Sequence, residues 1–442
     1  MTNKIHMNGP MAVIRSGKIS LLKQIKTLYQ WNATRSSTAS CIRGSKTASN
    51  DKASYLIVDE VEFRGIPGVI VCYNNPPVHQ VGNPALDAYL ESLKIIQANQ
   101  SSLRFLIMYS SADPIHAGGD LKESLVKLDQ TLEQQDKLKL QGASDAEIDI
   151  LYNWGDERLH KAFTLYQTLD KLRKSMRILN VCSGGTRYGG SAEMVLMADI
   201  IVGDSRSALC FSEPLIGLIP GWGGIGRTIS KAGVLNAKYL SFTATESKAS
   251  DLRNIGVFNV VIDVPMPLPR MRSRSPAMSG INSVPIISGQ KTDNPADDKN
   301  RYLEALEKNN EQTGRLLLPA ALELATCPES AIPGLKPDER KNLITDSQLQ
   351  EIIRRRSNPD NYCNLWNKPL AEVKDEISGL GRPLAPQSIN ALNTLFAGYD
   401  PATFNEEQFI KQEMELDARL YRDRRFRAGI IATLEQKVAD FS

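Results

Sequence analysis

The stretch GGTRYGGSAEMVLMADIIVGDSRSALCFSEPLIGLIPGWGG, residues 184–224, combines repeated glycine pairs with two glutamates. Within it, DIIVGD (199–204) is apolar enough for a buried strand, and residues 190–198 before it read as a helix. The apolar segment MRILNVCS (176–183) predicts a further strand. Because strand, helix and strand alternate, we expect a layered α/β fold.

The same alternation continues upstream of this stretch. YLIVDEVEFRGIPGVIVCYN (55–74) predicts two strands joined by a Gly-Ile-Pro-Gly turn. Apolar residues recur at helical spacing in 85–99, and LRFLIMYSS (103–111) predicts a buried strand. The long charged segment 121–175 looks helical and is expected to form a lid or wall.

Composition divides the chain into four parts. A stretch rich in proline, serine, arginine and asparagine interrupts the α/β pattern and indicates a linker or surface loop. The sequence after it is helical in pattern. We therefore expect a basic leader (1–50), an α/β core (51–265) with an insertion at about 125–170, a linker (266–300) and a helical C-terminal domain (301–442).

Bulk composition excludes several classes of protein. With 41% hydrophobic and 23% charged residues, the 442-residue chain is typical of soluble proteins, and no apolar run is long enough for a membrane span. The six cysteines are scattered singly, which indicates reduced thiols rather than disulfides or a zinc site. The four histidines form no ligand-like cluster, so we expect no metal.

The leader differs in charge from the rest of the chain. Residues 1–50 contain eight Lys or Arg and no Asp or Glu, so the remainder is mildly acidic and shows no nucleic-acid footprint. This composition fits an organellar transit peptide or a docking arm, and it lacks the apolar core of a secretory signal. We expect a cytoplasmic or mitochondrial-matrix protein that is not secreted.

Two glycine-rich segments have the chemistry of an oxyanion site. HAGGDLKE (116–123) follows a predicted strand, where a glycine pair leaves backbone N–H groups free and lets a ligand approach. YGGSAE (188–193) places glycines at the start of a helix, where N–H groups are also unsatisfied. If they converge, two such donors stabilise a developing oxyanion. Each segment alone is equally typical of a tight turn.

The order of three motifs is more specific than any one of them. AGGD at the end of a strand, GGSAE at a helix start and EPLIGLIPGWGG resemble the crotonase (enoyl-CoA hydratase/isomerase) family over roughly residues 55–265. The resemblance implies a crotonase-like ββα spiral core and acyl-CoA substrates. Coenzyme A would enter as part of the substrate, with no other cofactor and no metal.

The resemblance also assigns residues. It implies that the N–H groups of Gly119 and Gly190 form the oxyanion hole, and that Glu193 and Glu213 are the catalytic acids. Glu193 would activate the water added at C3, and Glu213 would protonate C2. The remaining candidates for substrate or coenzyme A contact are Ala117, Lys122 and His116.

Structural roles stay open for several of these residues. Glu193 could be an ion-paired helix residue, and Glu213 could pair with Arg206 or Arg227. His116 could be a turn residue and Lys122 a solvated side chain. We favour the catalytic interpretation for both glutamates and the turn interpretation for His116.

The tail suggests a second kind of enzyme. Residues 346–395, together with LYRDRRFRAGIIATLEQK (420–437), are similar to the tail of the 3-hydroxyisobutyryl-CoA hydrolase branch, which the double glycine of AGGD also suits. That branch normally lacks a glutamate at the position of Glu193. A hydratase would use both glutamates, whereas a hydrolase would use chiefly Glu213 to drive attack on the thioester carbonyl.

We therefore expect an acyl-CoA enzyme that adds water to an enoyl-CoA or performs related enolate chemistry. The alternatives are a thioester hydrolase and a non-catalytic binding protein with the same fold. The resemblance also implies a homo-oligomer, a trimer or hexamer, although the hydrolase-like tail could replace subunit contacts.

Overall fold

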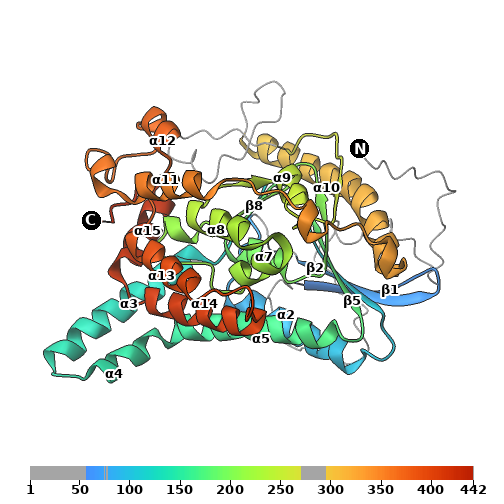
Figure 1. Ribbon diagram of the computed structural model, residues 1–442, viewed down its shortest axis with the longest axis horizontal. Coiled ribbons are helices and arrows are strands. Elements are labelled where there is room, and N and C mark those ends of the chain that lie inside the picture. The colour runs from blue at the N-terminus through green and yellow to red at the C-terminus, as the bar shows by residue number, and fades with distance from the viewer. Residues whose placement is uncertain (1–55, 74, 76–77, 270–294, 442) are drawn as a thin grey trace.

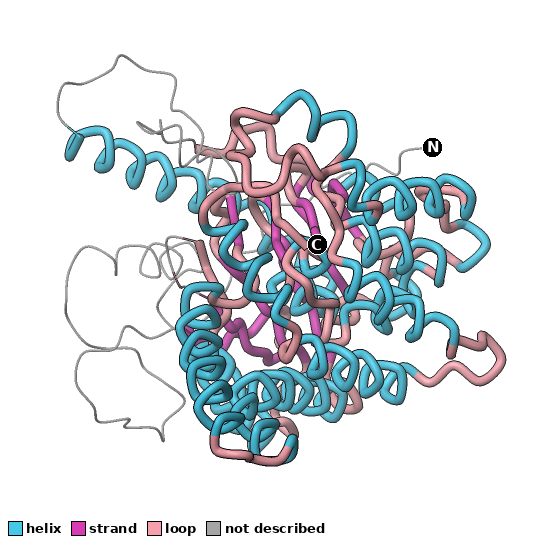
Figure 2. Tube along the Cα trace, turned by 90° about the vertical axis from the view of Figure 1, so that its left-hand side faces the viewer, coloured by secondary structure: helices cyan, strands magenta, loops and turns pink. Residues whose placement is uncertain are grey.

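The computed structural model describes residues 56–73, 75, 78–269 and 295–441. The predicted leader (1–50) and residues 270–294 of the predicted linker lie outside the described residues. Two β-sheets occupy the centre of the described part, with helices around them (Figures 1 and 2). The prediction of an α/β core with a helical C-terminal region is confirmed.

The larger sheet has six strands in the order β1-β2-β3-β5-β7-β10. Only β1 and β2 pair antiparallel; the other neighbours are parallel. Strands covered on both faces are expected to be almost continuously apolar, and β3 (FLIMYS) is an example. The bounds are Leu56–Phe63 (β1), Ile66–Tyr73 (β2), Phe105–Ser110 (β3), Arg177–Cys182 (β5), Ile200–Asp204 (β7) and Val260–Ile262 (β10).

The smaller sheet repeats the path of the larger one. Its order is β4-β6-β8-β9, and each of its first three strands directly follows a strand of the larger sheet along the chain. A long strand, a short strand and a helical segment therefore recur three times, which is the predicted ββα spiral. The bounds are Ile115–His116 (β4), Thr186–Tyr188 (β6), Ala208–Cys210 (β8) and Ser247–Lys248 (β9).

The first hairpin turns earlier than the sequence predicted. The turn is Arg64–Gly65, with φ of 55° and 76°, and β2 already begins at Ile66. Two consecutive left-handed residues match the twist of the flanking strands, whereas a turn through Pro67 would break the pairing of Pro67 with Glu62. The predicted Gly-Ile-Pro-Gly turn is therefore wrong.

Helices cover both faces of the larger sheet. On one face, α10 (Pro295–Thr326) packs Leu317, Ala321 and other apolar residues against β3, β5 and β7. The helix begins inside the segment predicted as a linker. On the other face lie α2 (Asn83–Ala98), α5 (Asn153–Leu172) and α6 (Gly190–Leu196).

The predicted insertion is helical. It comprises α3 (Leu121–Leu140), α4 (Asp145–Asp149), the short 3₁₀ turn η1 (Ile150–Tyr152) and α5. The ends of α3 and α4 project from the body at the lower left of Figure 1, whereas α5 packs into the core. The segment thus contributes both a projecting hairpin and a wall of the core.

The C-terminal helices pack onto the same core as the sheet. The largest apolar cluster contains Leu392, Phe409 and Ile430 together with Val69 and Leu106 of the sheet. Figure 1 shows α14 beside α5 although they are far apart in sequence. The remaining helices are α7 (Gly224–Ala232), α8 (Val234–Thr243), α9 (Ala249–Asn254), α11 (Asp346–Ser357), α12 (Lys374–Leu380), α13 (Pro386–Ala397), α14 (Glu406–Leu420) and α15 (Arg424–Leu434).

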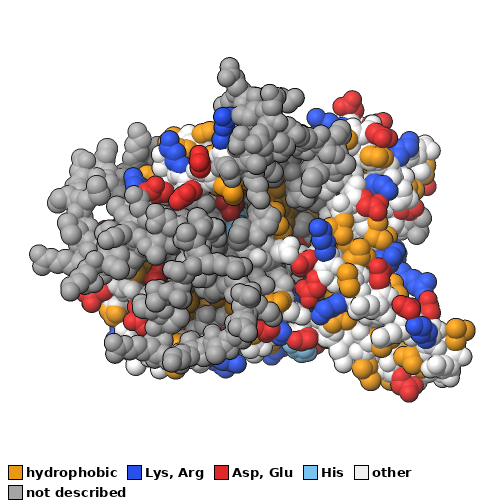
Figure 3. All heavy atoms as spheres, turned by 180° about the vertical axis from the view of Figure 1, so that it is seen from behind, with side chains coloured by type: hydrophobic (Ala, Val, Ile, Leu, Met, Phe, Trp, Pro, Cys, Tyr) orange, Lys and Arg blue, Asp and Glu red, His pale blue; other side chains and the backbone are white. Residues whose placement is uncertain are grey.

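Three further features of the described residues are the charges on their surface, the state of their cysteines and the apolar character of their helices. In the coloured part of Figure 3, side chains of both charge signs are interspersed over the visible face. The cysteines within the described residues are free thiols: Cys72, Cys182, Cys210, Cys327 and Cys363. In that part of the chain, no helix combines the length and apolar character needed to cross a bilayer.

Candidate active site

One cavity of about 750 Å³ contains the main chemical groups that the sequence singled out. Gly119, Gly190, Glu193 and Glu213 all line it. The first two come from the loop after β4 and the start of α6, and the glutamates come from α6 and the 3₁₀ turn η2 (Glu213–Leu215). The ββα repeats bring these loops together because β4, β6 and β8 are parallel neighbours. The loops that follow these strands therefore leave the small sheet at the same end.

The two glycine loops lie directly against each other. A Cβ added to Gly118 would come within 2.9 Å of the Tyr188 carbonyl oxygen and 3.1 Å of the Gly190 nitrogen. The Ser191 hydroxyl donates a hydrogen bond to the Ala117 carbonyl and ties the loops together. Only glycine at position 118 permits this approach without displacing backbone.

The amides of both loops remain available as donors. Within the described residues, the N–H groups of Gly119 and Gly190 donate to no other protein group. Gly190 is the first residue of α6, where an N–H has no intrahelical acceptor. Two unused donors on one cavity wall can stabilise an oxyanion.

Glu193 is buried and held by backbone. Its Oε1 accepts hydrogen bonds from the N–H groups of Trp222, at 2.8 Å, and Gly224, at 3.0 Å. Burial raises the pKa of Glu193 to about 7, although these two hydrogen bonds act in the opposite direction. This carboxyl can therefore exchange a proton near neutral pH.

Glu213 is also buried, but its carboxyl is held differently. Its Oε2 is buried and has no hydrogen-bond partner among the described residues. Its Oε1 lies 2.7 Å from the position that a Cβ on Gly189 would occupy, at the N-terminus of α6. Burial and the neighbouring Glu193 raise the pKa of Glu213 well above its usual range. The two carboxyls thus differ in proton affinity.

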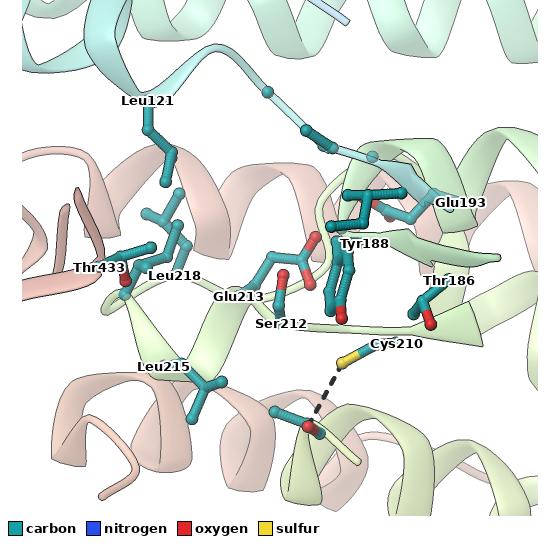
Figure 4. Close-up of a pocket in the computed structure, with 18 of the residues that line it drawn as sticks. Leu121, Thr186, Tyr188, Glu193, Cys210, Ser212, Glu213, Leu215, Leu218 and Thr433 are labelled. Atoms are coloured by element: carbon teal, nitrogen blue, oxygen red, sulfur yellow. Dashed lines mark hydrogen bonds between the residues drawn. The ribbon is translucent and has the colours of Figure 1, made fainter. Parts of the chain in front are cut away.

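The close-up separates a polar side of the cavity from an apolar side. In Figure 4, the carboxyl of Glu213 points toward Tyr188, with Glu193 beyond it. Leu121, Leu218 and Thr433 lie on the other side. A substrate in this cavity would present its reacting carbons to the carboxyls and its apolar part to the leucines.

The remaining predicted contact residues lie at different places. Ala117 lines the cavity. His116 does not: it is buried, and its ring stacks on His79 with the ring centroids 4.8 Å apart. Burial and nearby Arg187 lower the pKa of His116 well below its usual range, so the ring is neutral. Lys122 is exposed and outside the cavity wall.

The structural alternatives for Glu213 do not occur in the described residues. Arg206 pairs with Asp204 at 2.5 Å. Arg227 pairs with Glu406 of α14 at 3.2 Å. Both arginines therefore have other carboxylates, and Glu213 faces the cavity without a cation of its own.

Sequence reasoning missed three residues that line the cavity. Arg158 comes from α5 in the insertion, and Asp417 and Tyr421 come from the end of α14. All three are buried. For Arg158 and Asp417 the local signal is a charged residue inside an apolar helical stripe, which is also typical of a surface helix. Tyr421 has no local signal that separates it from a core tyrosine.

Among the described residues, no group of three or more His, Cys, Asp or Glu side chains could hold a metal ion.

Comparison with known proteins agrees with this geometry. Residues 156–268 match the family model described as enoyl-CoA hydratase/isomerase. The core has the ββα repeats that the sequence resemblance to this family implies. The matched segment includes Gly190 and both glutamates, whereas the AGGD loop precedes it.

Several solved structures are weakly similar to this chain. An enoyl-CoA hydratase from Bacillus anthracis shares 20% identity over 48% of this chain and 70% of its own, with a TM-score of 0.37. Pseudomonas aeruginosa DspI shares 18% over 50% and 72%, with a TM-score of 0.37. An enoyl-CoA hydratase from Mycobacterium avium subsp. paratuberculosis K-10 shares 11% over 87% and 98%, with a TM-score of 0.44.

Proposed function

We propose that this protein is an acyl-CoA enzyme that adds water across the double bond of an enoyl-CoA. The observation that carries the proposal is that two carboxyls and two unused backbone N–H donors line one cavity. In this assignment Gly119 and Gly190 bind the thioester oxygen. The substrate contributes coenzyme A, and no metal takes part.

The proposed reaction uses the two carboxyls in opposite protonation states. Ionised Glu193 takes a proton from water as the water oxygen bonds to C3. The C2–C3 π electrons move toward the thioester, and the resulting enolate oxygen is stabilised by the two N–H groups. Protonated Glu213 then gives its proton to C2, which yields the 3-hydroxyacyl-CoA. Two backbone N–H groups favour the ionised form of Glu193, whereas Oε2 of Glu213 has no partner among the described residues, which supports this order of roles.

One observation favours a second candidate, thioester hydrolysis. Both N–H groups that bind Glu193 engage the same oxygen, which fixes this carboxyl to backbone. Glu213 has no such partner on Oε2. A reaction that depends chiefly on Glu213 would direct water at the thioester carbonyl and release coenzyme A, as expected for an enzyme of the 3-hydroxyisobutyryl-CoA hydrolase type.

An assay series with two isosteric variants separates these reactions. Crotonyl-CoA, a cyclic enoyl-CoA and 3-hydroxyacyl-CoA thioesters would be supplied while hydration and free thiol are measured. Under the hydratase proposal, Glu193→Gln and Glu213→Gln each lower hydration by roughly 10²–10⁴-fold. Intact turnover in Glu193→Gln, with thiol release lost in Glu213→Gln, establishes the hydrolase instead. No turnover of any thioester would leave the binding-protein alternative.

A further inference from the structure

A wall of the cavity is formed by two helices outside the glycine loops. Arg158 of α5, together with Asp417 and Tyr421 at the end of α14, line the same cavity as the two glutamates. Each of the three is less than 5% exposed. This part of the cavity wall therefore includes three residues with polar side chains.

The register of the two helices brings these residues together. A Cβ on Gly155 would meet the Tyr421 ring at 2.9 Å, and Asp156 pairs with Arg422 at 3.1 Å. Arg158 is three residues after Gly155, and Asp417 is four residues before Tyr421, so each pair shares a helix face. The packed contact at Gly155 thus places Arg158 and Asp417 on the facing surfaces.

Arg158 places a buried cation beside the oxyanion loop. Its Nη1 donates to the Ser124 hydroxyl at 2.8 Å and lies 3.4 Å from the position of a Cβ on Gly119. Its Nη2 donates to Glu123 at 3.1 Å. Its Nε is buried without a partner among the described residues. A guanidinium has more donors than these two acceptors use.

Asp417 and Tyr421 belong to the same wall of the cavity. One carboxyl oxygen of Asp417 accepts from the Ile219 N–H at 3.0 Å, and the other lies 2.6 Å from the Cβ position of Gly221. Burial raises the pKa of Asp417 well above its usual range, and burial also raises the pKa of Tyr421. The Tyr421 hydroxyl is a hydrogen-bond donor, and the raised pKa of Asp417 favours its protonated form, which can also donate.

We propose that Arg158, Asp417 and Tyr421 form a donor subsite for a second carbonyl-type oxygen in the acyl group of the substrate. The substrate class is an oxoacyl- or carboxyacyl-CoA rather than a purely hydrocarbon enoyl-CoA. This inference rests on the proposed acyl-CoA function. The physical reason is that a hydrocarbon chain would leave buried donors unsatisfied, whereas an acceptor oxygen satisfies them.

Binding of non-reactive analogues tests the subsite separately from catalysis. Dethia analogues, in which CH₂ replaces the thioester sulfur, keep the carbonyl oxygen and cannot be hydrolysed or hydrated. The hexanoyl, 5-oxohexanoyl and 5-carboxypentanoyl analogues would be compared by calorimetry. We expect at least one oxygenated analogue to bind about tenfold more tightly than the hexanoyl analogue. The oxo and carboxy arms identify the accepting group.

Variants on the same helices provide the control. Arg158→Met and Asp417→Ala should lower the ratio of hexanoyl-analogue Kd to oxygenated-analogue Kd, here called the preference, to about one. Asp417→Asn keeps a donor and should retain most of the preference. Glu413→Gln is the matched control, because Glu413 is a buried carboxyl one turn earlier in α14 that contacts the Gly226 N–H and does not line the cavity. It should leave the preference unchanged.

Each contrary result has a distinct meaning. If all three analogues bind equally, or if Glu413→Gln loses the preference as fully as Asp417→Ala, the subsite is wrong and the proposed function stands. If none of the analogues binds, the acyl-CoA proposal fails, and the subsite fails with it.

Discussion

At the scale of single residues, Glu193 and Glu213 show how one side-chain type can take two roles. Both are buried, and burial alone raises both pKa values. Two backbone N–H groups partly offset that effect at Glu193, whereas the charge of Glu193 adds to it at Glu213. Because an acid–base pair needs one ionised and one protonated member at the same pH, this difference suits general acid–base chemistry.

The pH dependence of hydration should follow from this difference. Glu193 must be ionised to act as a base, so kcat/KM should fall as the pH drops below about 7. Glu213 must be protonated to act as an acid, so activity should fall again only at a pH well above the usual carboxyl range. Initial rates of enoyl-CoA hydration measured across the pH range would show both the acidic and the alkaline limb of the profile.

The Glu193→Gln variant supplies the control for that profile. Its residual activity should lack the acidic limb, because glutamine does not titrate. An acidic limb that persists unchanged in this variant would assign the titration to another group.

Gly118 offers a second test at this scale. A methyl group there would collide with backbone of the Tyr188–Gly190 loop. Gly118→Ala should therefore separate the two proposed oxyanion donors and lower kcat by roughly 10²–10³-fold, the usual effect of losing one donor. Steady-state kinetics together with circular dichroism would measure activity and folding in parallel.

Gly379→Ala is the matched control for this substitution. Gly379 is exposed in α12 and has nothing within 4 Å of its Cβ position. It should retain activity. A fully active Gly118→Ala protein would argue against convergence of the two loops.

At the scale of elements, α14 fixes the loop that contacts Glu193. Asp417 accepts from the Ile219 N–H, and Glu413 accepts from the Gly226 N–H at 2.5 Å, in the first turn of α7. A carboxyl at a helix N-terminus satisfies otherwise unpaired N–H groups. A helix far away in sequence thus holds the backbone that positions a candidate catalytic residue.

Removing the Glu413 side chain should weaken this arrangement. Glu413→Ala leaves buried N–H groups without an acceptor, which costs about 1–3 kcal/mol. Glu413→Gln keeps an acceptor oxygen and should cost less. Urea unfolding of both variants would measure the free energy of unfolding, and equal losses would show that hydrogen bonding to α7 is not what Glu413 contributes.

At the scale of the whole molecule, the described helical tail and the α/β core share one apolar cluster. Phe409, Ile410 and Phe426 belong to the same buried cluster as Val69 and Leu106. The tail also supplies part of the cavity wall. Packing of this kind couples the stability of the tail to that of the sheet.

Hydrogen exchange should reveal this coupling. Amides of α14 and of β5 should exchange with similar protection, because opening the tail exposes the apolar core that the sheet also needs. Native-state exchange with mass spectrometry at increasing urea would compare the two segments. Exchange of α14 at much lower urea than β5 would indicate an independently unfolding tail.

The sequence by itself determined the ordered motifs and the core strands. The apolar segments 103–111, 176–183 and 199–204 became β3, β5 and β7 because continuous apolar runs are buried on both faces of a parallel sheet. The glycines of AGGD and GGSAE could be recognised as candidate site residues because only glycine lets two backbone segments approach so closely. The first turn was predicted wrongly because Arg64 adopts a left-handed conformation, which arginine rarely does and which its residue type therefore does not predict.

Only the tertiary structure decided which distant groups share the cavity. His116 is next to Ala117 in sequence, yet it packs on His79 away from the cavity, while Asp417 lines it. Such placements depend on how helices dock across the fold, and long-range docking leaves no periodic or motif signal in a single sequence. Motifs formed by neighbouring residues can therefore be recognised in the sequence. The part of the cavity wall formed by α5 and α14 is instead determined by how these helices pack.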